Sequence, residues 1–464
     1  MSEKKESALS KKLLMHKENG GLLMDDKTIQ TADAFCEEYK NFLNLGKTER
    51  ESVDYLIDRV SKKGFVPFER GKKYVSGEKV YYNNRGKSLI LAVIGSEPIE
   101  SGVKIMASHI DSPRMDLKQV PLYEEAEVAL FKTHYYGGIK KYQWTAIPLS
   151  LHGVIVKSDL SKVQVNIGES ASDPVFCVTD LLPHLAEDQM KRPASQIIKG
   201  EELNLLIGSR PFRDDDASEK VKLNIAKILS DKYGIVESDF LSAELEIVPA
   251  FPAKDIGFDR SMVGAYGQDD RVCAFTSLEA TLDCSHPSKT VVTIFADKEE
   301  IGSSGSTGLK GAYLKYFIAD LAQPYGVEAR HVLANSKCLS ADVGAAYDPT
   351  FADVSERKNS AYVNYGTVVT KYTGSRGKGG SNDASAEFMG EVRKMLTDGN
   401  VLWQTAELGK VDQGGGGTVA AYIAELDVDT IDLGVPVLSM HSPFEVTSKI
   451  DIYSTYRAFF EFAK

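Results

Sequence analysis

Two kinds of apolar pattern alternate along the chain. Between residues 27 and 63, apolar side chains recur at intervals of three and four, which predicts helix, and a glycine-containing stretch at 46–48 divides it in two. Residues 88–95 and 103–110 are short, mostly apolar runs, as expected of strands buried on both faces of a sheet. The first part of the chain therefore predicts helices packed against a sheet.

The pattern of apolar and polar residues changes between about residues 115 and 250. Strand-like runs at 149–158 and 244–251 alternate with loops, and an acidic loop at 210–220 interrupts them. Because the signals on either side of this stretch match each other, we expect an inserted domain. The predicted boundaries are 115–251 for a β-rich insert and 1–114 with 252–464 for one discontinuous α/β domain.

The α/β pattern returns from residue 270 onward. Residues 271–283 read as a helix, and 290–297, 336–344 and 430–442 read as strands. The run at 414–424 begins with four glycines and reads as a turn entering a helix. The predicted fold class is α/β, with a central mixed sheet flanked by helices and interrupted by the β-rich insert.

Composition and charge exclude several classes of protein. The 464 residues carry a net charge of −11, so no basic stripe is available to neutralise nucleic-acid phosphates. No run of about 18 apolar residues predicts a membrane span. The N-terminus is charged and lacks a signal-peptide core, and the five cysteines are scattered without a CxxC pair. We expect a cytoplasmic protein with reduced thiols.

Metal-binding side chains follow the predicted central strands. Because ligands bind at the carboxyl ends of strands in open α/β sheets, these residues are expected to meet at one edge. They are His109 and Asp111 after 103–108, Asp269 before the 271–283 helix, Glu299 and Glu300 after 290–296, Asp342 after 336–341, and His441 after 430–440.

Histidine and carboxylate ligands suit zinc, and suit cobalt or manganese almost as well. Pairs of metal ions about 3.5–4 Å apart recur in hydrolases. Three carboxylates, Asp269, Glu300 and Asp342, together with a bridging hydroxide would balance the charge of two divalent cations. Of the neighbouring glutamates, one could bind metal while the other takes a proton from the bound water.

Five local strings resemble the aspartyl aminopeptidase and vacuolar aminopeptidase I family, in particular its bacterial branch. A lone His-x-Asp or Glu-Glu pair is usually structural, but the strings around these pairs are specific, and all five occur in the family's order over nearly the whole chain. They are SHIDSP (108–113), QDDR (268–271), DKEEIGSSGSTG (297–308), SADVGAAYDP (340–349) and MHSPFE (440–445).

The resemblance implies a metal-dependent aminopeptidase that removes the N-terminal residue of peptides through a dinuclear zinc-bound hydroxide. Asp269 would bridge the two ions, with His109 and Asp342 on one and Glu300 and His441 on the other. Glu299 would be the general base, and Asp111 would orient His109 through its other ring nitrogen.

The resemblance also implies an assembly. The insert would be a dimerisation domain, and dimers would form a tetrahedral dodecamer. His184, in the string PHLA (183–186), would enter the substrate site of the dimer partner. Lys371 would supply positive charge for an acidic N-terminal residue, or else belong to a solvated basic loop.

Two alternatives remain open at this stage. Related dinuclear folds include carboxypeptidases and N-acyl amino-acid deacylases, which would use the same ligands. A non-catalytic assembly protein could keep the fold, but retention of every ligand together with Glu299 argues against it.

Overall fold

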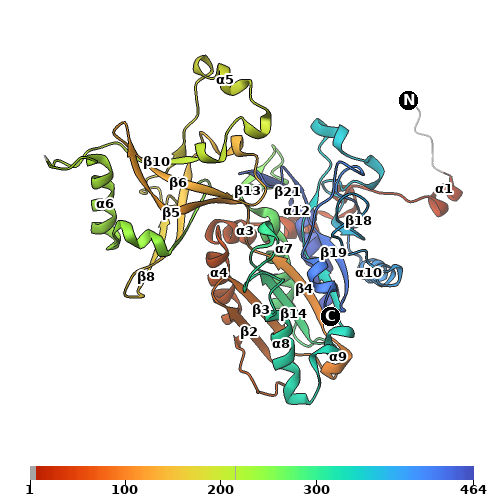
Figure 1. Ribbon diagram of the computed structural model, residues 1–464. Coiled ribbons are helices and arrows are strands. Elements are labelled where there is room, and N and C mark those ends of the chain that lie inside the picture. Colours follow the sequence, from red (N-terminus) through yellow and green to blue (C-terminus); the bar gives the residue numbers. More distant parts are fainter. Residues whose placement is uncertain (1–6, 215) are drawn as a thin grey trace.

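The computed structural model describes residues 7–214 and 216–464, which form two lobes (Figure 1). The larger lobe is built on a nine-stranded mixed sheet whose four central strands, β14, β4, β15 and β19, run parallel to one another. Across the sheet the strands are β1 (Val66–Pro67), β2 (Lys79–Asn84), β3 (Ser88–Val93), β14 (Val291–Ala296), β4 (Lys104–His109), β15 (Lys337–Ser340), β19 (Asp429–Gly434), β17 (Thr367–Thr370) and β18 (Trp403–Thr405).

Helices cover both faces of this sheet, because its central strands are apolar on both sides. Every residue of β3 and of β14 is buried, as their continuous apolar runs predict. One face carries α3 (Asp26–Leu45), α4 (Glu49–Ser61), α7 (Gln268–Asp283), α10 (Ala386–Asp398) and α12 (Lys449–Ala463). The other carries α8 (Tyr313–Ala322), α9 (Ala329–Ala334) and α11 (Ala420–Ala424).

The division between α3 and α4 falls where the sequence predicts it. The Thr48 side chain accepts a hydrogen bond from the Glu51 backbone N–H at 3.3 Å, and the Glu51 carboxylate accepts one from Thr48 at 3.2 Å. This reciprocal capping box satisfies two backbone donors at the start of α4.

The smaller lobe is a seven-stranded antiparallel sheet formed between residues 114 and 249. Its strands in order are β8 (Lys162–Ile167), β7 (Leu149–Val156), β11 (Ala243–Pro249), β5 (Arg114–Glu125), β6 (Val128–Tyr136), β10 (Asn204–Gly208) and β9 (Cys177–Val178). The short α5 (Glu187–Met190) lies at the outer end of this lobe in Figure 1. The helix α6 (Lys220–Tyr233), which the sequence analysis missed, packs on the sheet through Ile225, Leu229 and Tyr233.

A third sheet corrects one predicted strand. Residues 430–442 form two strands, because the chain leaves the large sheet after β19 and enters a five-stranded sheet as β20. At Gly434 a Cβ atom would lie 1.8 Å from the carbonyl oxygen of Asp342, so the two backbones touch where the chain changes sheet. The order is β12 (Lys254–Ile256), β13 (Met262–Ala265), β21 (Glu445–Ser448), β20 (Pro436–Leu438) and β16 (Gly344–Ala345).

The N-terminal part of the described chain carries two short helices, α1 (Ala8–Leu13) and α2 (Gly20–Leu23). In residues 7–214 and 216–464, no helix has the length and apolar character needed to cross a lipid bilayer.

Candidate metal centre

Three neighbouring parallel strands deliver side chains to one edge of the large sheet. His109 is the last residue of β4, and Asp342 follows β15 by two positions. Glu299 and Glu300 open a single turn of 3-10 helix after β14. Lys298, just before this turn, has a left-handed backbone (φ 67°), which bends the chain sharply towards His109.

Two more side chains reach the same place from other elements. Asp269 lies in the first turn of α7, and His441 lies in the loop after β20. His109 Nε2 is 3.2 Å from Oδ1 of Asp269, and His441 Nε2 is 3.2 Å from Oδ2 of the same carboxylate. One carboxylate therefore stands between two imidazoles, each facing a different oxygen.

Three groups of side chains among the described residues each bring one ligand atom per residue within 4.8 Å of one another. These groups are His109 with Asp270 and Asp342, His109 with Glu299 and Glu300, and Asp269 with Glu300 and His441. All six side chains to which the sequence analysis gave metal or base roles are included. Asp270 is an addition: its Oδ2 accepts the backbone N–H of His109 at 3.2 Å.

In both histidines the Nδ1 atom is hydrogen-bonded, which leaves Nε2 available to bind a metal. His109 Nδ1 lies 3.0 Å from the backbone carbonyl of Asp111, and His441 Nδ1 lies 2.9 Å from that of Gly138. A carbonyl oxygen can only accept, so each Nδ1 carries the proton and each Nε2 keeps its lone pair for a metal.

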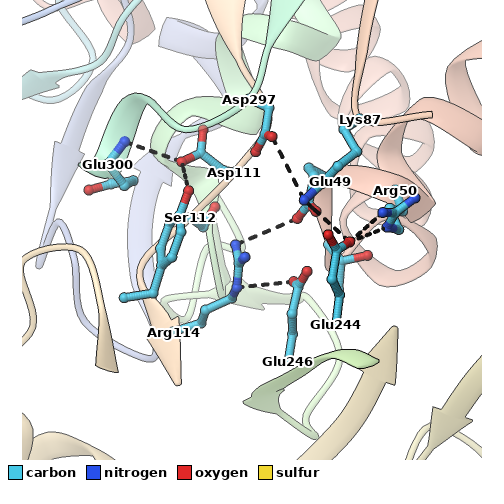
Figure 2. Close-up of polar contacts among 12 residues, drawn as sticks. Glu49, Arg50, Lys87, Asp111, Ser112, Arg114, Glu244, Glu246, Asp297 and Glu300 are labelled. Carbon is cyan, nitrogen blue, oxygen red and sulfur yellow. Dashed lines mark hydrogen bonds and ion pairs between the residues drawn. The ribbon is translucent and has the colours of Figure 1, made fainter. Parts of the chain in front are cut away.

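Asp111 braces the centre through its buried carboxylate as well as its carbonyl. Oδ1 lies 3.3 Å from Nδ1 of His109 and accepts the backbone N–H of Glu299 at 3.0 Å. Oδ2 accepts the backbone N–H of Glu300 at 3.2 Å (Figure 2). The resemblance implies that Asp111 orients His109 by a hydrogen bond to its other ring nitrogen, and the structure brings both the carbonyl and the carboxylate of Asp111 to Nδ1.

The carboxyl groups are crowded and poorly solvated. Burial, followed by the nearby charge of Asp269, raises the pKa of Glu300 well above its ordinary value. Burial, followed by Asp270, does the same to the pKa of Asp342. Burial also raises the pKa of Glu299 to about 7, a value suited to taking and returning protons near neutral pH.

These features fit a divalent metal. Oε1 of Glu300 and Oδ1 of Asp270 are buried and have no hydrogen-bond partner among the described residues, which is costly unless a ligand satisfies them. A cation between the carboxylates would also remove the repulsion that raises their pKa values. Histidine nitrogen and carboxylate oxygen together are a donor set that zinc prefers.

A buried network of charged side chains lies beside the centre (Figure 2). Glu49 lies 3.1 Å from Lys87 and 3.6 Å from Arg114, and Arg114 lies 3.2 Å from Glu246. Burial raises the pKa of Glu49, but Arg114 and Lys87 outweigh it and hold that pKa below its ordinary value. Because Arg114 and Glu246 belong to the smaller lobe, and Lys87 also faces Asp297 at 3.9 Å, the network fixes the two lobes together next to the centre.

A cavity of about 440 Å³ opens beside the carboxylates. Its walls include Met440, Tyr422 and the glycine run at 415–417, so that run lies against the candidate site. Gly415 has φ 112°, and a Cβ atom there would lie 2.0 Å from the carbonyl oxygen of Gly374. The glycine at this position therefore permits a backbone contact that shapes the cavity wall.

Two residues with predicted substrate roles lie elsewhere. His184 is exposed in a turn of the smaller lobe (Pro183–Leu185) close to α5 and does not line this cavity. Lys371 does not line it either, because its ammonium pairs with Asp383 at 2.5 Å. Within one chain, the structure does not bring either residue to the centre.

Glu445 is a further buried carboxylate that the sequence analysis did not assign. It accepts the backbone N–H of Asp269 at 3.0 Å and that of His441 at 2.7 Å, and so ties two candidate ligands together. The sequence signal that could have pointed to Glu445 is its position at the end of the MHSPFE string, four residues after His441.

Comparison with known proteins identifies the family and the fold of this chain. The family described as aminopeptidase I zinc metalloprotease (M18) matches residues 42–463. A relative from Clostridium acetobutylicum, a probable M18 family aminopeptidase 1, is 52% identical over 97% of this chain and 98% of its own length. The crystal structure of an M18 aminopeptidase from Thermotoga maritima superposes with a TM-score of 0.93 at 44% identity, covering 97% of this chain and 99% of that one.

A more distant likeness concerns the fold alone. The structure of the S. cerevisiae mApe1 dodecamer has a TM-score of 0.75 at 21% identity, covering 94% of this chain and 97% of that one. The family match, the identity with the relatives and the shared fold lead to one conclusion. This chain belongs to the aminopeptidase I zinc metalloprotease family (M18) and is a metal-dependent aminopeptidase, which hydrolyses peptide bonds.

Proposed function

We propose that this aminopeptidase binds two divalent ions, zinc by preference with cobalt or manganese as substitutes, at a centre bridged by Asp269. His109 and Asp342 complete one position, and Glu300 and His441 complete the other. The observation that carries the proposal is the Asp269 carboxylate, whose two oxygens each lie 3.2 Å from a different histidine Nε2. This arrangement is the one that a bridging ligand requires.

Bound zinc supplies Lewis acidity towards the scissile carbonyl and lowers the pKa of a water molecule towards neutrality. Glu299 takes a proton from the attacking water and returns it to the leaving nitrogen. Its carboxylate lines the cavity, lies 3.9 Å from His109 Nε2, and has a pKa of about 7. Asp111 holds the backbone of Glu299, and this contact fixes where the proton is exchanged.

The substrate we propose is a peptide with a free N-terminus. Glu300, Asp269 and Asp342 line the cavity, so the N-terminus of a peptide that enters it would reach the proposed metal positions. Because Lys371 shares the Asp383 carboxylate with Lys378 and lies outside the cavity, we assign no preference for an acidic N-terminal residue.

Paired substrates separate this activity from that of a carboxypeptidase or an N-acyl deacylase. We expect hydrolysis of aminoacyl-anilides, no hydrolysis of their N-acetylated forms, and loss of activity with a chelator that returns on adding zinc, cobalt or manganese. Release of acetate from N-acetyl amino acids, or of C-terminal residues from blocked peptides, would instead establish the alternative.

Glu299→Gln removes the proposed base without removing a ligand. We expect kcat to fall by about 10²–10⁴-fold, the usual contribution of a general base, while zinc content by elemental analysis stays at the wild-type level. Near-wild-type kcat in a zinc-loaded Gln variant would disprove the role of Glu299.

His441→Ala removes a ligand of one position only. We expect the purified variant to lose one zinc equivalent per chain, because Asp269 and Glu300 alone hold the second ion weakly. The matched control is His331→Ala, an exposed histidine in α9 that should keep the full metal content. Equal zinc in both variants would contradict the assignment.

We further propose that the β-rich insert, residues 115–251, mediates dimerisation, that dimers build a tetrahedral dodecamer, and that His184 acts in the site of the partner. Three observations support this. His184 lies outside the cavity of its own chain, the turn around it exposes Leu181, Leu182 and Leu185, and a protein of the same fold is a dodecamer.

Subunit complementation tests the role of His184. Neither His184→Ala nor Glu299→Gln alone should be active, but co-expressed subunits carrying different tags should recover activity in the mixed oligomer. A site with Glu299 then receives His184 from the other chain. If mixed oligomers form and their activity stays at the level of the separate variants, His184 does not act in trans.

A further inference from the structure

The end of strand β6, in the smaller lobe, touches the candidate centre at three consecutive residues. β6 ends at Tyr136, and Gly137 and Gly138 follow it. Tyr136 contacts Asp111, Gly137 lies against Glu300, and Gly138 contacts His441. We call residues 136–138 the Tyr-Gly-Gly segment.

Tyr136 acts on the carboxylate that braces the centre. Its hydroxyl donates to Oδ2 of Asp111 at 2.8 Å, and this contact is buried. The same carboxylate accepts the backbone N–H groups of Glu299 and Glu300. The guanidinium of Arg114 lies 3.9 Å from the centre of the tyrosine ring, which fixes the ring and thus the direction of the hydroxyl.

The two glycines place backbone where an added Cβ atom would crowd the neighbouring side chain. The Gly138 carbonyl accepts from Nδ1 of His441 at 2.9 Å, and a Cβ atom on Gly138 would lie 3.3 Å from that nitrogen. Gly137 has φ 74°, and a Cβ atom there would lie 3.3 Å from Cβ of Glu300. The segment therefore packs directly on the two side chains that we assign to the second metal position.

We propose that the Tyr-Gly-Gly segment positions the metal centre from the smaller lobe. Tyr136 would act through Asp111 on His109 and the glutamate pair, and Gly138 would set the ring and tautomer of His441. The smaller lobe is then part of the catalytic apparatus as well as an assembly element. This inference rests on the proposed function, because it takes those residues as the ligands and base.

Tyr136→Phe tests the first contact, since it removes only the hydroxyl. We expect the rate of zinc transfer to a chelator to rise, and kcat to fall, by about 10–100-fold, the usual effect of losing an outer partner of a ligand. KM should stay close to the wild-type value, because Tyr136 does not line the cavity.

The matched control is Tyr74→Phe. Tyr74 is also buried, and its hydroxyl accepts the Glu69 backbone N–H at 2.7 Å, but it packs in the core cluster beneath α8 and α9. We expect it to lower the melting temperature without changing zinc transfer or kcat. If the two variants behave alike in zinc transfer, the role of Tyr136 is structural only and the proposal fails.

A double-mutant cycle with Asp111→Asn shows whether Tyr136 acts through that carboxylate. The double variant should be no worse than Asp111→Asn alone in kcat and in zinc transfer. Additive losses would mean that Tyr136 acts by another route, which would overturn the positioning role.

Gly138→Ala probes the second contact without relying on Tyr136, so it serves if Tyr136→Phe fails to fold. We expect preferential loss of one zinc equivalent, as for His441→Ala. The control is Gly200→Ala in the same lobe, where the added Cβ makes only ordinary contact with Tyr135, 3.5 Å away. Full zinc in both variants contradicts the proposal.

The outcomes also separate this inference from the proposed function. If wild-type protein binds no zinc, or His441→Ala keeps all of it, the metal assignment itself fails. If those assays succeed while Tyr136→Phe and Gly138→Ala match their controls, only the role of the Tyr-Gly-Gly segment is wrong.

Discussion

The Asp269 carboxylate between two histidines is the constraint on which the rest of the site depends. Two imidazoles can face one carboxylate only if β4, the start of α7 and the loop after β20 are all held in place. Buried carboxylates hold these elements in place. Asp111 accepts a hydrogen bond from the backbone N–H of Glu299, and Glu445 accepts hydrogen bonds from the backbone N–H groups of Asp269 and His441. Much of the polar structure around the centre thus serves to fix acidic groups that would otherwise repel one another.

The sequence was most informative where burial leaves few choices. β14 is buried at every position, and a strand of that kind must be a continuous apolar run, so it and the acidic residues after it could be predicted. The prediction of one strand at 430–442 is wrong, because the apolar run continues past Gly434 while the chain changes sheet there. The backbone contact between Gly434 and Asp342 at this point has no signal in the sequence. The helix α6 was missed beside an acidic loop.

The proposed ligands are easier to predict from the sequence than most of the groups that hold them. His109, Asp269 and His441 lie in distinctive strings, whereas Tyr136 and Gly138 have no local pattern that points to the centre. The contact from His441 to Gly138 spans 303 positions and depends only on how the lobes meet. Similarly, nothing near Lys371 in the sequence shows that it pairs with Asp383, 12 positions later, and shares that carboxylate with Lys378.

The chain leaves the large sheet just after His109 and builds the whole second lobe. It re-enters the larger lobe through β12 and β13, shortly before Asp269 and Asp270. His109 and Asp270 touch although 161 positions separate them. During synthesis, a ribosome-bound chain therefore holds a lone histidine for as long as the intervening lobe takes to emerge. The proposed centre is complete only after synthesis has reached His441, which contacts Asp269, and after both lobes have folded and met.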